Sequence, residues 1–308
     1  MYSPFPLLRL PGVVLCEIFK SLKIGEKIKL SLCSKKVSIQ INNARLYSQK
    51  VIVDLDRLCH KIKVYSENNK DSFEIFVHFN YGICDPNSIK VEGRTLSVIS
   101  VLHGIKTFWK NHQEGFLSVI RHLLKIFRCK FSIYNDFYSD LYEKTISELF
   151  NLQVEFKTLT IHFKRAGDQH LFWNQISNKL GLVEDLLISS TFDSDFIPVF
   201  TSWPQNINIL NSDWFTLESL LTCPCTTITL WNSSLGNKDL DEILKNWKSG
   251  GFPNLERLII HSHRIRNNGT TILGMNLEEM VIQTDDGSKK ATFKLGYQSI
   301  EMSVTVSQ

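Results

Sequence analysis

The side chains best suited to hold a metal occur as two pairs, Cys223 with Cys225 and His261 with His263. Thiolates and imidazoles are the usual ligands of zinc, and the two members of a ligand pair are normally separated by about two to four residues. Here a single residue separates the members of each pair, and no second matched pair lies between them. We therefore expect neither a metal site nor a cofactor site in this chain.

A group of carboxylates at Asp239, Asp241 and Glu242 has the chemistry needed for general acid–base catalysis. These residues open an amphipathic segment, however, and the dipole of a helix stabilises carboxylates in its first turn. Cys16 and Cys33 lie within apolar patterns that are typical of packed thiols. The sequence contains no G-x-S-x-G, H-E-x-x-H, Walker or dinucleotide-binding pattern. We therefore expect that the chain is not an enzyme.

The first 50 residues contain the apolar stripes of three short helices. Pro11 suits the start of the first helix, because a proline there loses no needed N–H group. Gly25 interrupts the pattern, and Glu26 lies near the start of a second helix, where a carboxylate is favoured. Three helices in about 40 residues are small for an independent core, so we expect this segment to complete its core on another surface. The three stripes are Val14, Leu15, Ile18, Phe19 and Leu22; Ile24, Ile28 and Leu32; and Val37, Ile41 and Ala44.

Composition limits the class of protein. The chain has 308 residues, of which 43% are hydrophobic, so it can bury a large core. No run approaches the roughly 18 apolar residues of a membrane helix, so we expect no membrane association. The seven cysteines are odd in number and scattered through apolar runs, as expected of reduced thiols. This usage predicts a cytoplasmic or nuclear protein.

The net charge of +4 is unevenly distributed, since residues 1–50 carry +7 and residues 51–308 carry −3. A basic segment can bind nucleic acid or dock on an acidic protein surface. The segment lacks the interleaved aromatic residues on which single-stranded bases stack. Nucleic acid is therefore the less favoured partner, and a nucleic-acid-binding protein or general scaffold remains the alternative function.

The Leu10-Pro11 start, the apolar faces of the first two helices and the run from Leu30 to Lys36 are similar to the F-box. The resemblance covers residues 5–46, with Val37 at a position where many F-boxes carry an aromatic residue. It implies that the segment binds a Skp-type adaptor and, through it, a cullin. The adaptor-binding residues that it implies are Leu10, Pro11, Val14, Leu15, Ile18, Phe19, Leu22, Ile28 and Leu32.

The C-terminal half resembles the type 2 F-box-associated domain of nematode F-box proteins. The similarity is carried by the runs Trp203-Pro204, Trp214 to Glu218 and Phe252 to Glu256. It implies that this half recruits a protein target, whose identity the sequence does not give. We therefore expect an F-box module at residues 1–50 and a recognition domain at residues 51–308, best matched at 170–265.

Pairs of apolar residues in β-prone segments recur along this half at intervals of 21 to 30 residues. Segments of helical length separate them, and one of these has Asn237 as a possible cap and Leu240 and Trp247 in its buried stripe. Such a period predicts a degenerate leucine-rich-repeat-like α/β stack with a largely parallel sheet. An ordinary mixed α/β domain is the alternative. The pairs are Phe131/Ile133, Leu159/Ile161, Leu186/Ile188, Ile207/Ile209, Ile228/Leu230, Leu258/Ile260 and Met280/Ile282.

Residues 51–128 are assigned no function of their own. Alternation at Ile62/Val64 and Ile75/Val77 predicts strands, Asn68 to Asp71 predicts a turn, and the stripe from Phe116 to Phe127 predicts a helix.

A row of outward-facing residues follows from this stack, because side chains alternate along a strand. If each apolar pair faces the core, the residue three positions beyond its first member lies on the open face. Trp231 would be the natural anchor there, since tryptophan is common at binding hot spots. The alternative is that a loop or terminal segment covers Trp231 and makes it a core residue. The predicted target-binding row is His162, Ser189, Leu210, Trp231, His261 and Gln283. The sequence therefore favours a substrate-recruiting adaptor subunit of a Skp–cullin–F-box ubiquitin ligase.

Overall fold

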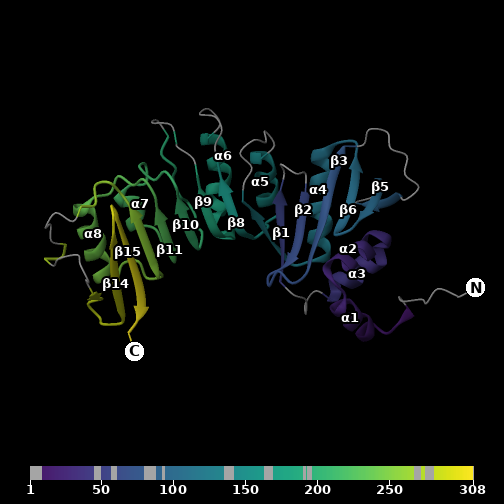
Figure 1. Cartoon of the computed structure of the whole chain (residues 1–308), viewed down its shortest axis with the longest axis horizontal. Helices are drawn as coiled ribbons and strands as arrows, with labels where there is room; N and C mark the ends of the chain where they lie inside the picture. Colours follow the sequence, from purple (N-terminus) through teal and green to yellow (C-terminus); the bar gives the residue numbers. More distant parts are fainter. Residues whose placement is uncertain are drawn as a thin grey trace, which may run out of the picture. The chain divides into compact units, whose positions relative to one another are not determined.

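The structure is a computed structural model, shown in Figure 1. It describes residues 9–44, 50–56, 61–79, 88–91, 94–134, 142–162, 169–189, 192, 196–266, 272–274 and 281–307. The chain divides into two compact units, residues 1–148 and residues 149–308.

The first unit begins with the three predicted helices, α1 (Gly12–Ser21), α2 (Ile24–Cys33) and α3 (Lys35–Ala44). Pro11 is the N-cap of α1, and Glu26 caps α2 by accepting a hydrogen bond from the Lys23 N–H at 2.8 Å. The apolar stripes supply the buried side chains of this bundle, as the spacing predicted. They include Leu15, Phe19, Ile24, Ile28, Val37 and Ile41.

A mixed sheet follows in the same unit (Figure 1). Its strands lie in the order β7-β1-β2-β3-β6-β5-β4. The β1–β7 and β3–β6 pairs are parallel, and the β1–β2, β2–β3, β4–β5 and β5–β6 pairs are antiparallel. The predicted strands around Ile62 and Ile75 are confirmed. The strands are β1 (Val51–Asp56), β2 (Lys61–Ser66), β3 (Ser72–Phe79), β4 (Ser88–Val91), β5 (Arg94–Val101), β6 (Gly104–Trp109) and β7 (Cys129–Ile133).

Helix α4 (His112–Ile126) is the predicted helix before β7. The side chain of Asn111 caps it by accepting a hydrogen bond from the Glu114 N–H at 3.1 Å. Phe116, Ile120 and Leu123 are fully buried and form its packed stripe. A short helix, α5 (Tyr142–Asn151), follows β7.

The second unit contains the predicted parallel stack. Strands β8 to β12 pair in sequence order and in parallel, and the apolar pairs align in register, with Leu186 opposite Leu159 and Ile207. The α/β fold class is therefore confirmed. The strands are β8 (Phe156–Ile161), β9 (Val183–Ile188), β10 (Asn206–Ile209), β11 (Thr227–Leu230) and β12 (Arg257–His261).

The β8–β9, β10–β11 and β11–β12 connections contain helices, as the period predicted, whereas the described residues of the β9–β10 connection contain none. Helix α8 carries the expected buried stripe, with Leu240, Ile243, Leu244 and Trp247 at most 1% exposed. Its N-cap is Gly236, one residue before the predicted Asn237, and Asp239 accepts the Gly236 N–H at 2.8 Å. The helices are α6 (Gln169–Ile176), the 3₁₀ segment η4 (Ser177–Leu182), α7 (Leu217–Leu221) and α8 (Asn237–Lys248).

The end of the stack differs from the prediction, which placed a strand at Met280/Ile282 beside β12. The neighbour of β12 is β15 (Ser299–Val306), which pairs with it antiparallel, and β14 (Lys289–Gly296) and β13 (Val281–Gln283) lie beyond. The physical reason is the β14–β15 hairpin, whose Ile300 and Met302 are buried on the core face opposite Ile260 and Leu258. Met280 lies outside the described residues.

Candidate adaptor and target interfaces

Helix α1 exposes apolar side chains on the outer side of the first unit. Val13 is 77% exposed and Val14 is 42% exposed, and Pro11 is exposed beside them. Ile18 and Leu22 are half-buried on the same helix and its C-cap. Leu10 and Leu32 are also half-buried. Six of the nine predicted adaptor-binding residues are therefore accessible among the described residues.

The other three predicted adaptor-binding residues are buried. Leu15, Phe19 and Ile28 are 4%, 1% and 0% exposed. Their side chains form the core among the helices. The structure therefore corrects their role: they stabilise the helical bundle and are not exposed for contact with the adaptor. The prediction failed here because spacing shows that a residue lies on an apolar stripe but not whether that stripe faces a partner or the protein's own core. For the same reason the prediction did not include Val13, which lies outside the apolar stripe but is exposed.

The buried side of the three helices is completed by the sheet and α4 of the same unit. The Ile24 N–H at the start of α2 donates to Asp71 Oδ2 at 2.6 Å. Ser31 Oγ and His122 Nε2 form a buried hydrogen bond of 2.8 Å. Gly25 lies so close to the Phe73 ring that an added Cβ would meet it at 2.4 Å. The expected second surface is therefore supplied by this chain itself.

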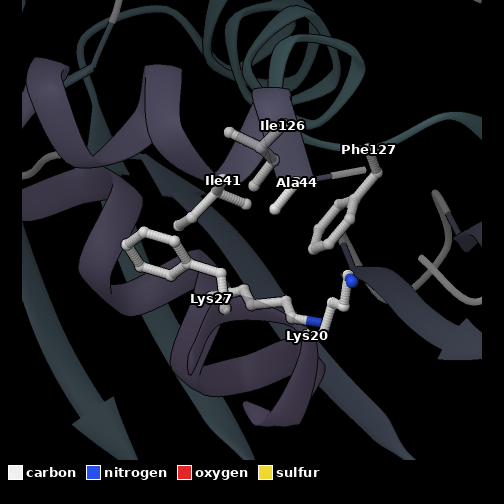
Figure 2. A pocket seen from close by; sticks show the side chains of 7 residues that line it. Lys20, Lys27, Ile41, Ala44, Ile126 and Phe127 are labelled. Atoms are coloured by element: carbon white, nitrogen blue, oxygen red, sulfur yellow. The ribbon is translucent and has the colours of Figure 1, made fainter. Parts of the chain in front are cut away.

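A small cavity lies between these helices and the end of α4, with a volume of about 10 Å³. This is room for about one water molecule. Lys27 is only 6% exposed there, and burial lowers the pKa of its amine, opposed by the charge of Asp71. Figure 2 shows Lys20 and Lys27 extending along the side of the cavity opposite Ile41 and Ile126. The lining residues are Phe19, Lys20, Lys27, Ile41, Ala44, Ile126 and Phe127.

The predicted target-binding row is contiguous in the second unit from His162 to His261. The backbone N–H groups of Ser189, Leu210 and Trp231 each continue the parallel ladder by donating to the preceding strand. His162 Nδ1 lies 3.2 Å from Ser189 Oγ. Leu210 and Trp231 are 38% and 40% exposed, so Trp231 is not a core residue.

Gln283 does not belong to this row. It lies on β13, and β14 and β15 separate it from β12. The prediction assumed that the parallel stack continued past His261, whereas the hairpin after it reverses the chain direction.

Within the row, the side chains of Trp231 and His261 are in close contact. Their ring centroids are 3.7 Å apart and their planes differ by 4°, so the rings stack face to face. Burial lowers the pKa of His261, which favours the neutral imidazole. The arrangement places a stacked and partly exposed aromatic pair at the C-terminal end of the parallel strands.

A second aromatic cluster lies around the connection from β9 to β10, and the target-binding prediction did not include it. Phe200 stacks on Trp203 at 4.3 Å, and Phe192 packs edge-on against Trp214 at 4.7 Å. Both tryptophans belong to the runs that resemble the F-box-associated domain. The spacing argument missed the cluster because the connection has no regular secondary structure in its described residues.

The candidate metal ligands do not converge. Cys223 and Cys225 are buried, and hydrogen bonding with Cys223 together with burial raises the pKa of Cys225. The Cys225 thiol donates to the Pro204 carbonyl at 3.1 Å. His263 is exposed, whereas His261 is stacked on Trp231. Within the described ranges, no group of three or more His, Cys, Asp or Glu side chains is arranged to hold a metal ion.

The acidic residues of α8 have structural partners. Asp239 caps the helix through Gly236, and Asp241 accepts from the Leu273 N–H at 2.8 Å. Asp241 also pairs with Lys245 at 2.6 Å. These contacts account for the carboxylates as helix-stabilising groups. In the part of the chain that the structure describes, no helix is long and apolar enough to cross a membrane.

Comparison with known families finds matches for two segments of the chain. The F-box domain family matches residues 7–49, and the F-box associated family matches residues 199–260. The chain therefore carries an F-box followed by an F-box-associated domain. The predicted resemblance is confirmed for both segments. The finer division into modules at residues 1–50 and 51–308 stays a prediction.

Two relatives of this chain come from the nematode Caenorhabditis elegans, in line with the predicted resemblance to nematode F-box proteins. E3 ubiquitin-protein ligase hecw-1 is 26% identical over 287 positions, which cover 80% of this chain and 22% of that protein. Uncharacterized protein F59B2.8 is 21% identical over 277 positions, which cover 83% of this chain and 60% of that protein. The chain thus spans less than two thirds of the length of either relative. No solved structure matches the chain.

Proposed function

We propose that this protein is a substrate-recruiting subunit of a Skp–cullin–F-box ubiquitin ligase. The observation that carries the proposal is the presence of an F-box and an F-box-associated domain in one chain. F-box domains generally bind Skp1 and, through it, a cullin. The similarity to E3 ubiquitin-protein ligase hecw-1 supports the link to ubiquitin transfer.

The adaptor would bind the exposed apolar side of α1. Val13 and Val14 are open to solvent there, while Leu15 and Phe19 on the opposite side are buried in the bundle. Clustered exposed apolar side chains mark protein-binding surfaces. The contact set is the accessible part of the predicted residues, with Val13 added: Leu10, Pro11, Val13, Val14, Ile18, Leu22 and Leu32.

The target would bind the second unit, on the row from His162 to His261. In this arrangement the chain holds the target and the other subunits of the ligase perform the transfer chemistry, so the chain itself is not an enzyme and needs no cofactor. The cytoplasm or the nucleus would be its compartment, since its ligase partners act there.

An adaptor pull-down tests the proposal. The paired substitution Val13→Asp and Val14→Asp places two charges on the exposed side of α1 and should abolish recovery of purified Skp1. Leu102→Asp is the matched control, because Leu102 is 91% exposed in the turn between β5 and β6 of the same unit. Equal recovery of Skp1 by the wild type, the paired variant and the control would contradict adaptor binding through α1.

A further inference from the structure

The stacked rings of Trp231 and His261 are part of a larger exposed surface. Leu210 lies beside Trp231 on the neighbouring strand of the row, and both side chains are more than a third exposed. A partly exposed tryptophan whose orientation is fixed by stacking on a second ring is a suitable anchor for a partner side chain. We call this surface, made by Leu210, Trp231 and His261, the aromatic plate.

Tyr297 extends the apolar surface from the neighbouring hairpin. It is 92% exposed in the turn between β14 and β15. The next residue, Gln298, accepts a hydrogen bond from the Ser262 N–H at 2.9 Å, which ties this turn to the segment that follows β12. His261 is also paired with Ser299 across the β12–β15 ladder. The turn is therefore held beside the aromatic plate.

Positive charge gathers at the same end of the strands. His263, Arg264 and Arg266 are exposed, and residues 261–266 contain no acidic side chain. In the described part of the chain, Arg264 and Arg266 have no carboxylate within ion-pair distance. By contrast, Arg257 at the other end of β12 pairs with Glu301 at 2.7 Å. The two guanidinium groups at this end are thus not neutralised by described side chains.

The fold positions these two arginines. Arg264 donates one guanidinium N–H to the Ser234 carbonyl at 3.1 Å, which leaves its other donors for a ligand. The backbone of Arg266 is held on both sides by Asn237, through bonds of 3.2 Å and 2.9 Å. Two carboxylates lie in this area. Asp213 is exposed and its carbonyl accepts from Ser234 Oγ, and Asp239 accepts the Gly236 N–H beside Arg264.

We infer that this end of the sheet binds an acidic, extended segment of a target protein. Carboxylates or phosphates of the segment would contact Arg264 and Arg266, because a guanidinium forms paired hydrogen bonds with either group. An apolar side chain of the same segment would pack on the aromatic plate. The inference rests on the proposed function, since it names the class of target for the same receptor.

A protein segment fits this surface better than a nucleic acid does. A nucleic acid needs a track of cations along its phosphate backbone. Among the described residues of the second unit, the guanidinium groups without an ion pair are those of Arg264 and Arg266, at one end of the strands. Arg257 pairs with Glu301, and residues 51–308 carry a net charge of −3. A target segment with a few acidic side chains around one apolar residue matches the small number of positive charges at this end of the sheet.

Fluorescence polarisation of labelled probes with the full chain tests the inference. The first probe is a fluorescein-labelled peptide of roughly twelve residues, about 40 Å when extended, in which Glu and Asp surround a central Leu. The second replaces each Glu with Gln and each Asp with Asn. The third is a labelled single-stranded RNA of similar length. We expect the acidic peptide to bind and the amide peptide to bind at least about tenfold more weakly, because the ion pairs are lost.

Matched variants locate the contact. Arg264→Gln with Arg266→Gln should weaken binding of the acidic peptide by about tenfold or more. Trp231→Leu should weaken it separately, because it removes the stacked ring and keeps an apolar side chain. Lys35→Gln with Lys36→Gln, on exposed positions of α3, removes the same charge and should leave binding unchanged.

Three results would overturn the inference. They are equal binding of the acidic and amide peptides, unchanged binding by the arginine variant, and tighter binding of the RNA through the same arginines. Skp1 recovery by the same preparations separates the two proposals. If the wild-type chain recovers Skp1 but does not bind the acidic peptide, the acidic-target surface alone is refuted. If the wild-type chain does not recover Skp1, the proposed adaptor function is refuted.

Discussion

Asp71 caps a helix that lies 47 positions earlier in the chain. Its Oδ2 accepts the Ile24 N–H at 2.6 Å, so the turn between β2 and β3 satisfies a free donor at the start of α2. The F-box helices are thereby fixed to the sheet by a hydrogen bond as well as by apolar packing. An F-box that is built into the first unit in this way would present its adaptor-binding side in a defined orientation relative to that sheet.

Removing this cap should destabilise the first unit. Asp71→Ala should lower the free energy of unfolding by about 1 kcal/mol, the usual cost of a lost helix cap. Lys70→Ala alters an exposed residue of the same turn and should change stability little. Urea denaturation followed by circular dichroism measures both effects, and equal midpoints for the two variants would show that the Asp71 bond contributes nothing.

Lys27 should limit stability at neutral pH. Its pKa is lowered by burial, so the unfolded chain binds this proton more tightly than the folded chain. Stability therefore rises with pH between the lowered folded pKa and the unfolded value of about 10.4. Lys27→Met keeps the length and removes the charge, so it should raise the free energy of unfolding at pH 7 by about 1 kcal/mol.

The pH dependence distinguishes this explanation from better packing. The advantage of Lys27→Met should shrink as pH rises from 7 towards about 10, because the wild-type amine becomes neutral. Denaturation curves at several pH values measure the difference. Lys36→Met controls for the loss of one positive charge, and a gap between Lys27→Met and the wild type that stays constant with pH would exclude the burial cost as its cause.

Two classes of F-box residue should behave differently. Phe19→Ala empties a core position that is 1% exposed and should cost about 3 to 5 kcal/mol, so Skp1 binding would be lost through unfolding. Pro11→Ala with Ile18→Ala changes accessible positions and should lose Skp1 with a nearly unchanged circular dichroism spectrum. Retained Skp1 binding by the folded pair would remove Pro11 and Ile18 from the interface.

Trp231 and Trp247, two of the tryptophans of the second unit, provide a matched test of burial. Trp247 is 0% exposed, and Trp247→Ala should cost about 3 to 5 kcal/mol. Trp231→Ala removes a surface ring stacked on His261, and its cost should stay near 1 kcal/mol. The same change exposes His261, so the pKa of that imidazole should rise towards about 6.5 in an NMR titration. An unchanged His261 titration would mean that Trp231 does not shield it.

The reactivity of the cysteine thiols should depend on their burial. Cys33 is exposed, whereas Cys223 and Cys225 are 2% exposed and the pKa of Cys225 is raised. Iodoacetamide at pH 8 should therefore modify Cys33 in the folded protein and reach Cys223 and Cys225 only after unfolding, as peptide mass mapping would show. Rapid native alkylation of Cys225, or stoichiometric zinc by elemental analysis, would contradict the assignment of these thiols to the core.

The sequence by itself determined the local features of this protein. Repeating apolar spacing located α1 to α3, and the paired apolar positions located β8 to β12, because side-chain periodicity reflects which face of an element is buried. The F-box and F-box-associated resemblances came from short runs of residues. The row from His162 to His261 also followed from strand alternation alone.

Only the tertiary structure decided which apolar faces meet each other. Leu15, Phe19 and Ile28 form a core and Val13 faces solvent, although all four belong to one apolar region of the sequence. The bond from Ile24 to Asp71 joins residues whose proximity depends on how the β2–β3 turn packs against α2. The hairpin that places β15 beside β12 removed Gln283 from the row, because strand order is set by long-range pairing that local periodicity does not encode.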